Sequence, residues 1–213
     1  MSDTPNFYLS NRTKLMGLLP ENSVVIVPSG TEQIRNRDVE FPFRAESDFF
    51  YLTGFTEPDS VLVLVKAQGV ESHLFVRPKD PEQETWQGRR LGVEAAAETL
   101  LINEAWSIDD LEDGVLELLK NINSVYVSFS QNLEFLGSVH VWISVLKQKV
   151  RQGILAPKQI CDLDCCLHEL RVVKSDEEIQ RMRQAAHISV QGHLAAMQAV
   201  QPAKFEFQVQ AEL

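Results

Sequence analysis

The chain has 213 residues, of which 44% are hydrophobic and 23% are charged, and this balance is that of a folded globular protein rather than a disordered or fibrous one. A chain of this length buries about 70% of the surface that its unfolded form exposes, so its stability requires neither disulfides nor a structural metal. The net charge of −10 disfavours nucleic acid and anionic membrane surfaces as partners.

The sequence shows neither a membrane span nor an export signal. The longest apolar run, residues 61–65, is far shorter than the roughly 18 residues that a spanning helix needs. No Lys or Arg precedes Arg12, and no apolar segment follows the N-terminus as it would in a signal peptide. The three cysteines, Cys161, Cys165 and Cys166, do not form a disulfide framework. We therefore predict a cytoplasmic protein with reduced thiols that does not bind membranes.

The hydrophobic pattern alternates between helices and strands. A capped helix is predicted from Ser10 to the proline at position 20, and the β-branched run 23–27 predicts a buried strand. The remaining elements predicted before residue 151 are a hairpin of 61–65 with 72–76, short helices within 82–86 and 93–101, a helix from 109 to 120, a strand at 124–129 and a long amphipathic helix over 133–150. This order indicates an α/β fold with a mixed sheet and flanking helices.

The last forty residues have a different character. Ser175 and the three carboxylates that follow it predict a firm helix start, and the helix extends to Pro202. No strands follow to cover its apolar positions Ile179, Met182, Val190, Leu194 and Met197. We therefore predict two domains, 1–173 and 174–213, of which the second is truncated. Its uncovered apolar face should pair with another chain, pack back or fray.

Few groupings of polar residues suggest chemistry. Cys161, Cys165 and His168 have the spacing that would place two thiols and an imidazole on one helical face, where they could bind zinc. The fourth ligand of a structural zinc site is missing, and buried cysteines commonly serve as small hydrophobic residues. The acidic pair Asp162 and Asp164 fits a helix start better than acid–base catalysis. His187 and His193 fall on nearly opposite helix faces and are predicted to be surface residues.

The stretch from Trp86 to Arg90, Trp-Gln-Gly-Arg-Arg, combines an indole, a flexible glycine and two guanidinium groups. Such a combination could form an edge that recognises anions or contacts a partner. A tryptophan on a short helix could equally belong to the core, and periodicity alone leaves both alternatives open.

Three segments carry a resemblance to a known family. Residues 44–58, RAESDFFYLTGFTEP, resemble the signature of the N-terminal domain of bacterial Xaa-Pro aminopeptidases, members of the creatinase and methionine-aminopeptidase superfamily. The segments 86–92 and 168–179 are similar to this family in the expected places, so the resemblance covers nearly the whole chain. It implies a ribonuclease-H-like N-terminal domain followed by the start of a pita-bread catalytic domain. In the strongest segment, the aromatic residues Phe49, Tyr51 and Phe55 could serve the core as well as a site.

The resemblance also implies a division of labour. In the family, two Asp, one His and two Glu hold two metal ions, usually manganese, and all five ligands lie downstream of the linker helix. No position in this chain matches them, so we predict no catalytic and no metal-binding residue here, and no peptidase activity of the chain alone. The family's substrates are peptides with proline in second position. Its N-terminal domain limits access to a neighbouring subunit's site, which implies a homo-oligomer and makes Trp86 the one candidate for a residue at that mouth. The alternative is a stand-alone binding module of the same fold, as in the histone chaperone of the FACT complex.

Overall fold

A computed structural model describes residues 5–130, 133–201 and 205–213. Along the chain these residues form α1 (Pro5–Leu18), β1 (Ser23–Pro28), β2 (Ile34–Asn36), β3 (Val39–Glu40), α2 (Ser47–Thr53), β4 (Val61–Lys66), β5 (Val70–Val76), α3 (Pro81–Gln87), α4 (Gly92–Leu100), β6 (Glu104–Ser107), α5 (Leu111–Leu118), β7 (Ser124–Val127), α6 (Leu133–Gln148), β8 (Gln159–Asp162), α7 (Asp164–Val172), α8 (Asp176–Ala199) and α9 (Glu206–Gln210). Short 3₁₀ turns precede α5 and follow α6. The element order confirms the predicted α/β fold.

The sheet has six strands in the order β6-β5-β4-β1-β7-β8 and is mixed. β1 lies in its middle, antiparallel to β4 on one side and parallel to β7 on the other, so that Ser23 faces both Lys66 and Ser124. The predicted hairpin is confirmed, because β4 and β5 pair antiparallel with Val61 opposite Phe75. β6 and β8 close the two edges in parallel with their neighbours.

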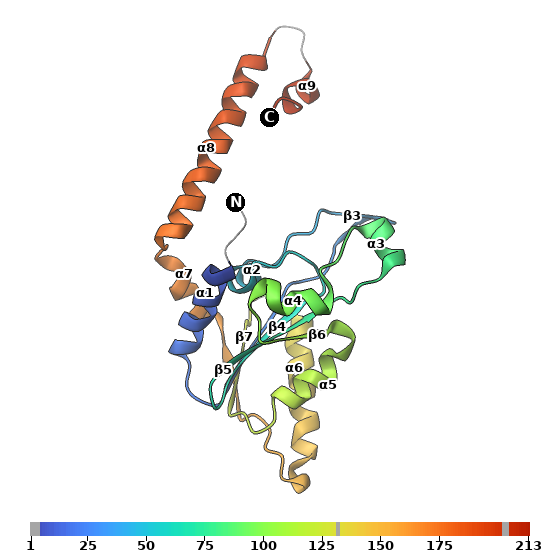
Figure 1. Cartoon of the computed structure of the whole chain (residues 1–213), viewed down its shortest axis with the longest axis vertical. Helices are drawn as coiled ribbons and strands as arrows, with labels where there is room; N and C mark the ends of the chain where they lie inside the picture. Colours follow the sequence, from blue (N-terminus) through green and yellow to red (C-terminus); the bar gives the residue numbers. More distant parts are fainter. Residues whose placement is uncertain (1–4, 131–132, 202–204) are drawn as a thin grey trace. The chain divides into compact units, whose positions relative to one another are not determined.

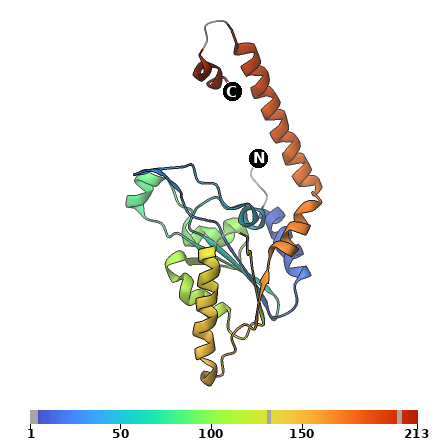
Figure 2. The ribbon, with the colours of Figure 1, turned by 180° about the vertical axis from the view of Figure 1, so that it is seen from behind.

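Helices cover both faces of this sheet, which produces two apolar layers. On one face α1, α2, α4 and α7 pack over alternate strand residues such as Val25, Leu62 and Leu74. On the other face α5 and α6 pack over the intervening residues, among them Val24 and Val63. Figures 1 and 2 show α5 and α6 grouped away from α1 and α2. The strands of the centre are continuous apolar runs because both of their faces are covered.

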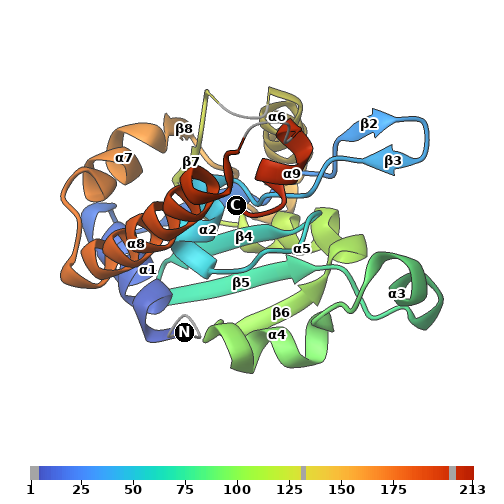
Figure 3. The same cartoon turned by 90° about the horizontal axis from the view of Figure 1, so that it is seen from above.

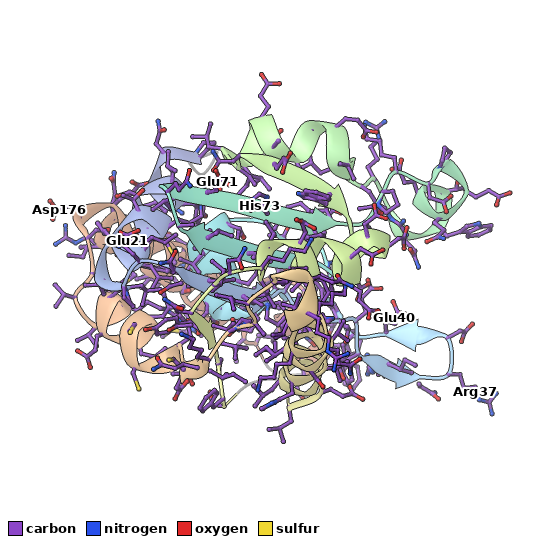
Figure 4. All side chains as sticks on the ribbon, turned by 90° about the horizontal axis from the view of Figure 1, so that it is seen from below. Glu21, Arg37, Glu40, Glu71, His73 and Asp176 are labelled. Carbon is purple, nitrogen blue, oxygen red and sulfur yellow. The ribbon has the colours of Figure 1, made fainter. Side chains whose placement is uncertain are left out.

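Two pieces extend beyond the sheet. The antiparallel pair β2 and β3 forms a ribbon in which every residue is exposed, and α3 buries none of its residues. Figure 3 shows both pieces projecting from the same end of the domain. Arg37, in the turn of the ribbon, adopts a left-handed φ of 53°, and its side chain points away from the domain in Figure 4.

The chain divides into two compact units, Met1–Leu170 and Arg171–Leu213. The predicted start of the last helix is confirmed, because Ser175 and Glu178 form a reciprocal capping box at the beginning of α8. α9 contacts α8, and a Cβ added at Gly192 would lie 3.3 Å from the carbonyl oxygen of Leu213, so the C-terminal segment packs back on the helix. Much of the predicted apolar face of α8 is nevertheless exposed, at Met182, Val190, Leu194 and Met197.

Several elements differ from the sequence-based expectation. α1 begins at Pro5 rather than at Ser10, in accord with the preference for proline in the first helical turn. β6 and β8, together with the β2–β3 ribbon, lie where no strand was predicted. Within the described residues, no helix combines the length and the apolar content that crossing a lipid bilayer demands.

Candidate functional site

The segment 44–58 forms α2 and the turns on either side of it. The Glu46 carboxylate caps the helix by accepting hydrogen bonds from the backbone N–H of Asp48 (2.7 Å) and of Phe49 (3.1 Å). Gly54 ends the helix in the left-handed region with φ 68°. A Cβ at Gly54 would lie 2.2 Å from Cε2 of Tyr8, so this position requires glycine for two reasons.

The aromatic residues of this segment serve mainly the core. Phe49 is fully buried and Phe55 is 5% exposed, whereas Tyr51 is partly buried against the same cluster. The Thr53 hydroxyl donates to the carbonyl of Phe49 (2.8 Å) and accepts from the N–H of Phe55 (3.0 Å), which locks the end of α2. The interpretation of Phe49 and Phe55 as core residues is confirmed.

A buried arginine, which the sequence analysis missed, joins three helices below this segment. Arg12 of α1 is 2% exposed and donates to the carbonyl oxygens of Leu52 (2.8 Å), Leu100 (3.2 Å) and Leu101 (2.6 Å), at the ends of α2 and α4. Burial lowers the pKa of Arg12 to about 10, which leaves the guanidinium charged at neutral pH. The available signal was a charged residue between the apolar positions Tyr8 and Leu15 of one helix.

Trp86 lies on α3 and is 89% exposed, so the alternative that placed it in the core is wrong. The physical reason is that α3 projects from the sheet and contributes nothing to either apolar layer. A depression beside α3 is lined by three cationic and four acidic side chains, which does not favour an anion. The Trp86 indole is instead exposed to solvent, on a helix that projects from the domain in Figure 3.

The proposed zinc ligands are not on one helical face. Cys161 lies in β8, paired with Tyr126 of β7, whereas Cys165 and His168 belong to α7. The zinc alternative assumed one continuous helix, and it is wrong because a short edge strand precedes the helix. Burial, then the neighbouring thiols of Cys165 and Cys161 and the Asp162 carboxylate, raise the pKa of Cys166. This cysteine is therefore a poor source of thiolate.

His168 instead approaches two carboxylates. Its Nε2 lies 3.4 Å from Oδ2 of Asp48 and 3.9 Å from Oδ1 of Asp164. Among the residues that the structure describes, this is the single group of three or more His, Cys, Asp or Glu side chains that could share one metal ion, with ligand atoms within 4.8 Å of one another. Polar contacts between the imidazole and the two carboxylates account for such a cluster without a metal, and neither Cys161 nor Cys165 belongs to it.

The other acidic and imidazole candidates have structural explanations. Asp162 Oδ1 accepts hydrogen bonds from the backbone N–H of Phe129 (3.3 Å) and of Asp164 (3.2 Å), which confirms its role at the start of α7. His187 and His193 are exposed on α8, as predicted.

Comparison with known proteins gives these observations a context. A sequence model of the aminopeptidase P N-terminal domain matches residues 8–126. The chain is 38% identical over 203 residues to the Xaa-Pro aminopeptidase of Haemophilus influenzae, a match that covers 95% of this chain and 45% of that protein.

Solved structures show the same similarity to aminopeptidases. The structure of proline aminopeptidase P II from Yersinia pestis superimposes with a TM-score of 0.91 at 36% identity, over 99% of this chain and 49% of that one. A zinc-substituted Escherichia coli aminopeptidase P in complex with product gives a TM-score of 0.93 at 32% identity, over 100% of this chain and 49% of that chain. The chain thus spans about half the length of the relatives that it matches. It belongs to the aminopeptidase P family and corresponds to the N-terminal part of an Xaa-Pro aminopeptidase.

Proposed function

We propose that this chain is the non-catalytic part of a metal-dependent enzyme that removes the first residue from peptides with proline in second position. The likeness to Xaa-Pro aminopeptidases over 95% of the chain carries this proposal. In such an enzyme the described fold supports the catalytic half and limits access to it. The cytoplasmic location predicted from the sequence belongs to the same proposal.

The donor set of this chain does not fit a two-metal centre. Five ligands from two Asp, one His and two Glu are implied by the family resemblance, whereas the one group found among the described residues offers three donors. Its Asp48 is 1% exposed and its His168 already lies within ion-pair distance of both carboxylates. We therefore assign no step of peptide hydrolysis to these residues, and propose that two manganese ions are held by the catalytic half.

Two incubations test this division. The purified chain with Mn²⁺ and an Xaa-Pro peptide should release no free amino acid, and release above the rate without protein would overturn the proposal. The same chain joined to the catalytic half of the Haemophilus influenzae relative should cleave the peptide. A joined protein that is folded, binds Mn²⁺ and still fails to cleave would also contradict it.

We propose further that Trp86 lies at the mouth of a neighbouring subunit's site in a homo-oligomer. The support is an indole with 89% exposure, on a helix that projects beyond the sheet, because exposed aromatic side chains are frequent anchors at interfaces. In the joined protein, Trp86→Ala should raise KM several-fold with little change in kcat, and Trp86→Phe should restore most of the loss. An unchanged KM, or a monomer by light scattering, would refute this role.

A further inference from the structure

α3 has no apolar attachment to the domain. None of the residues in Pro81–Gln87 is buried, and a helix of this length is not stable by itself in water. Asp80 caps its first turn by accepting from the N–H groups of Glu82 (3.0 Å) and Gln83 (3.2 Å), and Gly88 ends it with φ 90°. These caps define the helix locally but do not fix it to the sheet.

Arg90 supplies the attachment. Its side chain is directed back under the helix, where Nη1 donates to the carbonyl of Pro78 (3.2 Å) and Nη2 donates to Oε1 of both Gln83 and Gln87, the latter at 3.0 Å. Its backbone N–H donates to Oε1 of Glu84 (3.3 Å). One residue therefore binds the strand exit before α3 and two successive turns of α3 itself.

Arg90 lines the depression beside α3 together with four acidic side chains, but no carboxylate among the described residues lies within ion-pair distance of its guanidinium. Arg90 is nevertheless only 9% exposed. Its side-chain partners are a carbonyl and two amide oxygens, all neutral. A planar fork with preset donor directions suits the fixing of geometry better than a flexible ammonium would. Gln83 and Gln87 are exposed, so water can replace the guanidinium without loss to the apolar layers.

We propose that Arg90 is a positioning residue that holds α3 against the domain and thereby fixes the direction in which Trp86 projects. Trp86 lies between Gln83 and Gln87 in sequence, so the two contacts bracket it on the helix. The functional value of this arrangement rests on the proposed role of Trp86 at the mouth of a neighbouring site. The positioning of α3 by Arg90 involves residues of this chain alone.

Fluorine NMR of the chain labelled with fluorotryptophan tests whether Arg90 holds α3 and Trp86 in place. The sequence contains three tryptophans, and Trp86→Phe identifies the resonance of Trp86. In Arg90→Ala, that resonance should narrow roughly twofold, because the helix gains fast motion. The resonances of Trp106 and Trp142 should stay unchanged. Arg89→Ala is the matched control, since Arg89 is exposed and its loss should leave the linewidths of all three resonances unchanged.

Further variants separate positioning from general stability. Arg90→Lys keeps the charge but cannot reach the three oxygens with one fork, so a linewidth of the Trp86 resonance between those of the unchanged chain and Arg90→Ala is expected. A Trp86 resonance that is unchanged in Arg90→Ala overturns the inference, and so does a change of all three resonances together, which would mean a purely structural role. Neither result depends on substrate. An unchanged KM in Trp86→Ala would refute the role at the mouth and leave the fluorine result standing.

Discussion

The α2 region and α3 each contain part of a segment that resembles the family, yet they are held in opposite ways. Around α2, Phe49 and Leu52 are fully buried and Arg12 binds the carbonyl ends of two helices. α3 buries no residue and is held by hydrogen bonds from Arg90. The more extensive motif therefore preserves the fold, and the shorter one presents a side chain to solvent. The strength of a family signature does not indicate where a site lies.

Loss of a ring from the α2 region should have the largest effect. Phe49→Ala removes a fully buried side chain, and we expect the free energy of unfolding to fall by about 3–5 kcal/mol because a cavity is left behind. Phe41→Ala is the control, as Phe41 is 52% exposed and should change stability by less than about 1 kcal/mol. Urea unfolding measures both variants, and equal losses would mean that the buried ring does not stabilise the α2 region.

The turn after α2 should be nearly as sensitive. Gly54→Ala places a Cβ against the ring of Tyr8 and forces a left-handed backbone on alanine, so a loss of about 2–4 kcal/mol is expected. Gly153→Ala shares the left-handed conformation, with φ 82°, but a Cβ there meets nothing within 4 Å. It should lose only about 1 kcal/mol. The difference between the two variants isolates the contact with Tyr8, and it should shrink when Tyr8→Ala is combined with Gly54→Ala.

Truncation of the exposed indole on α3 should barely affect the fold. Trp86→Ala is expected to change the free energy of unfolding by less than about 0.5 kcal/mol. Trp142→Ala removes an indole of α6 that is 5% exposed and packs in the apolar layer between α6 and the sheet. The free energy of unfolding should fall by about 3–5 kcal/mol. Thermal or urea unfolding measures both variants, and a large loss of stability in Trp86→Ala would place the indole in a packed environment.

The smallest effect concerns the reactivity of the two thiols within α7. A raised pKa leaves Cys166 mostly protonated at pH 8, whereas Cys165 is exposed, so iodoacetamide should modify Cys165 first. The same rise in the pKa of Cys166 makes the stability of the fold depend on pH. Because the pKa of Cys166 is higher in the folded chain than the ordinary 9.0, its contribution is present below about pH 9 and is lost as the pH rises through the folded value. Cys165→Ser and Cys166→Ser, compared by mass spectrometry, assign the labelling.

The sequence predicted the centre of the fold better than its edges. β1 and β4 are buried on both faces and are therefore apolar along almost their whole length, which makes them easy to recognise in the sequence. β6 and β8 pair on one side only and remain partly exposed, so nothing in their composition distinguishes them from loops. That ambiguity caused the error at Cys161.

The proposed role of Trp86 was harder to anticipate. Trp86 could be singled out by type and by resemblance, but its exposure depends on the projection of α3 from the sheet. Arg12 and Arg90 act by donating hydrogen bonds to backbone carbonyls and to side-chain amide oxygens. These partners either lie far away in the sequence or form no recognisable sequence pattern. Hydrogen bonds of this kind leave no periodic trace, because any residue can supply a carbonyl.

The position of β1 has a consequence for biosynthesis. Its antiparallel neighbour β4 is made soon after it, but its parallel neighbour β7 begins only at Ser124. During synthesis, one hydrogen-bonding edge of the apolar strand β1 therefore stays unpaired until more than half of the chain has emerged, and such unpaired edges invite aggregation. A nascent chain halted shortly before Ser124 should bind a general chaperone more tightly than one halted after β8.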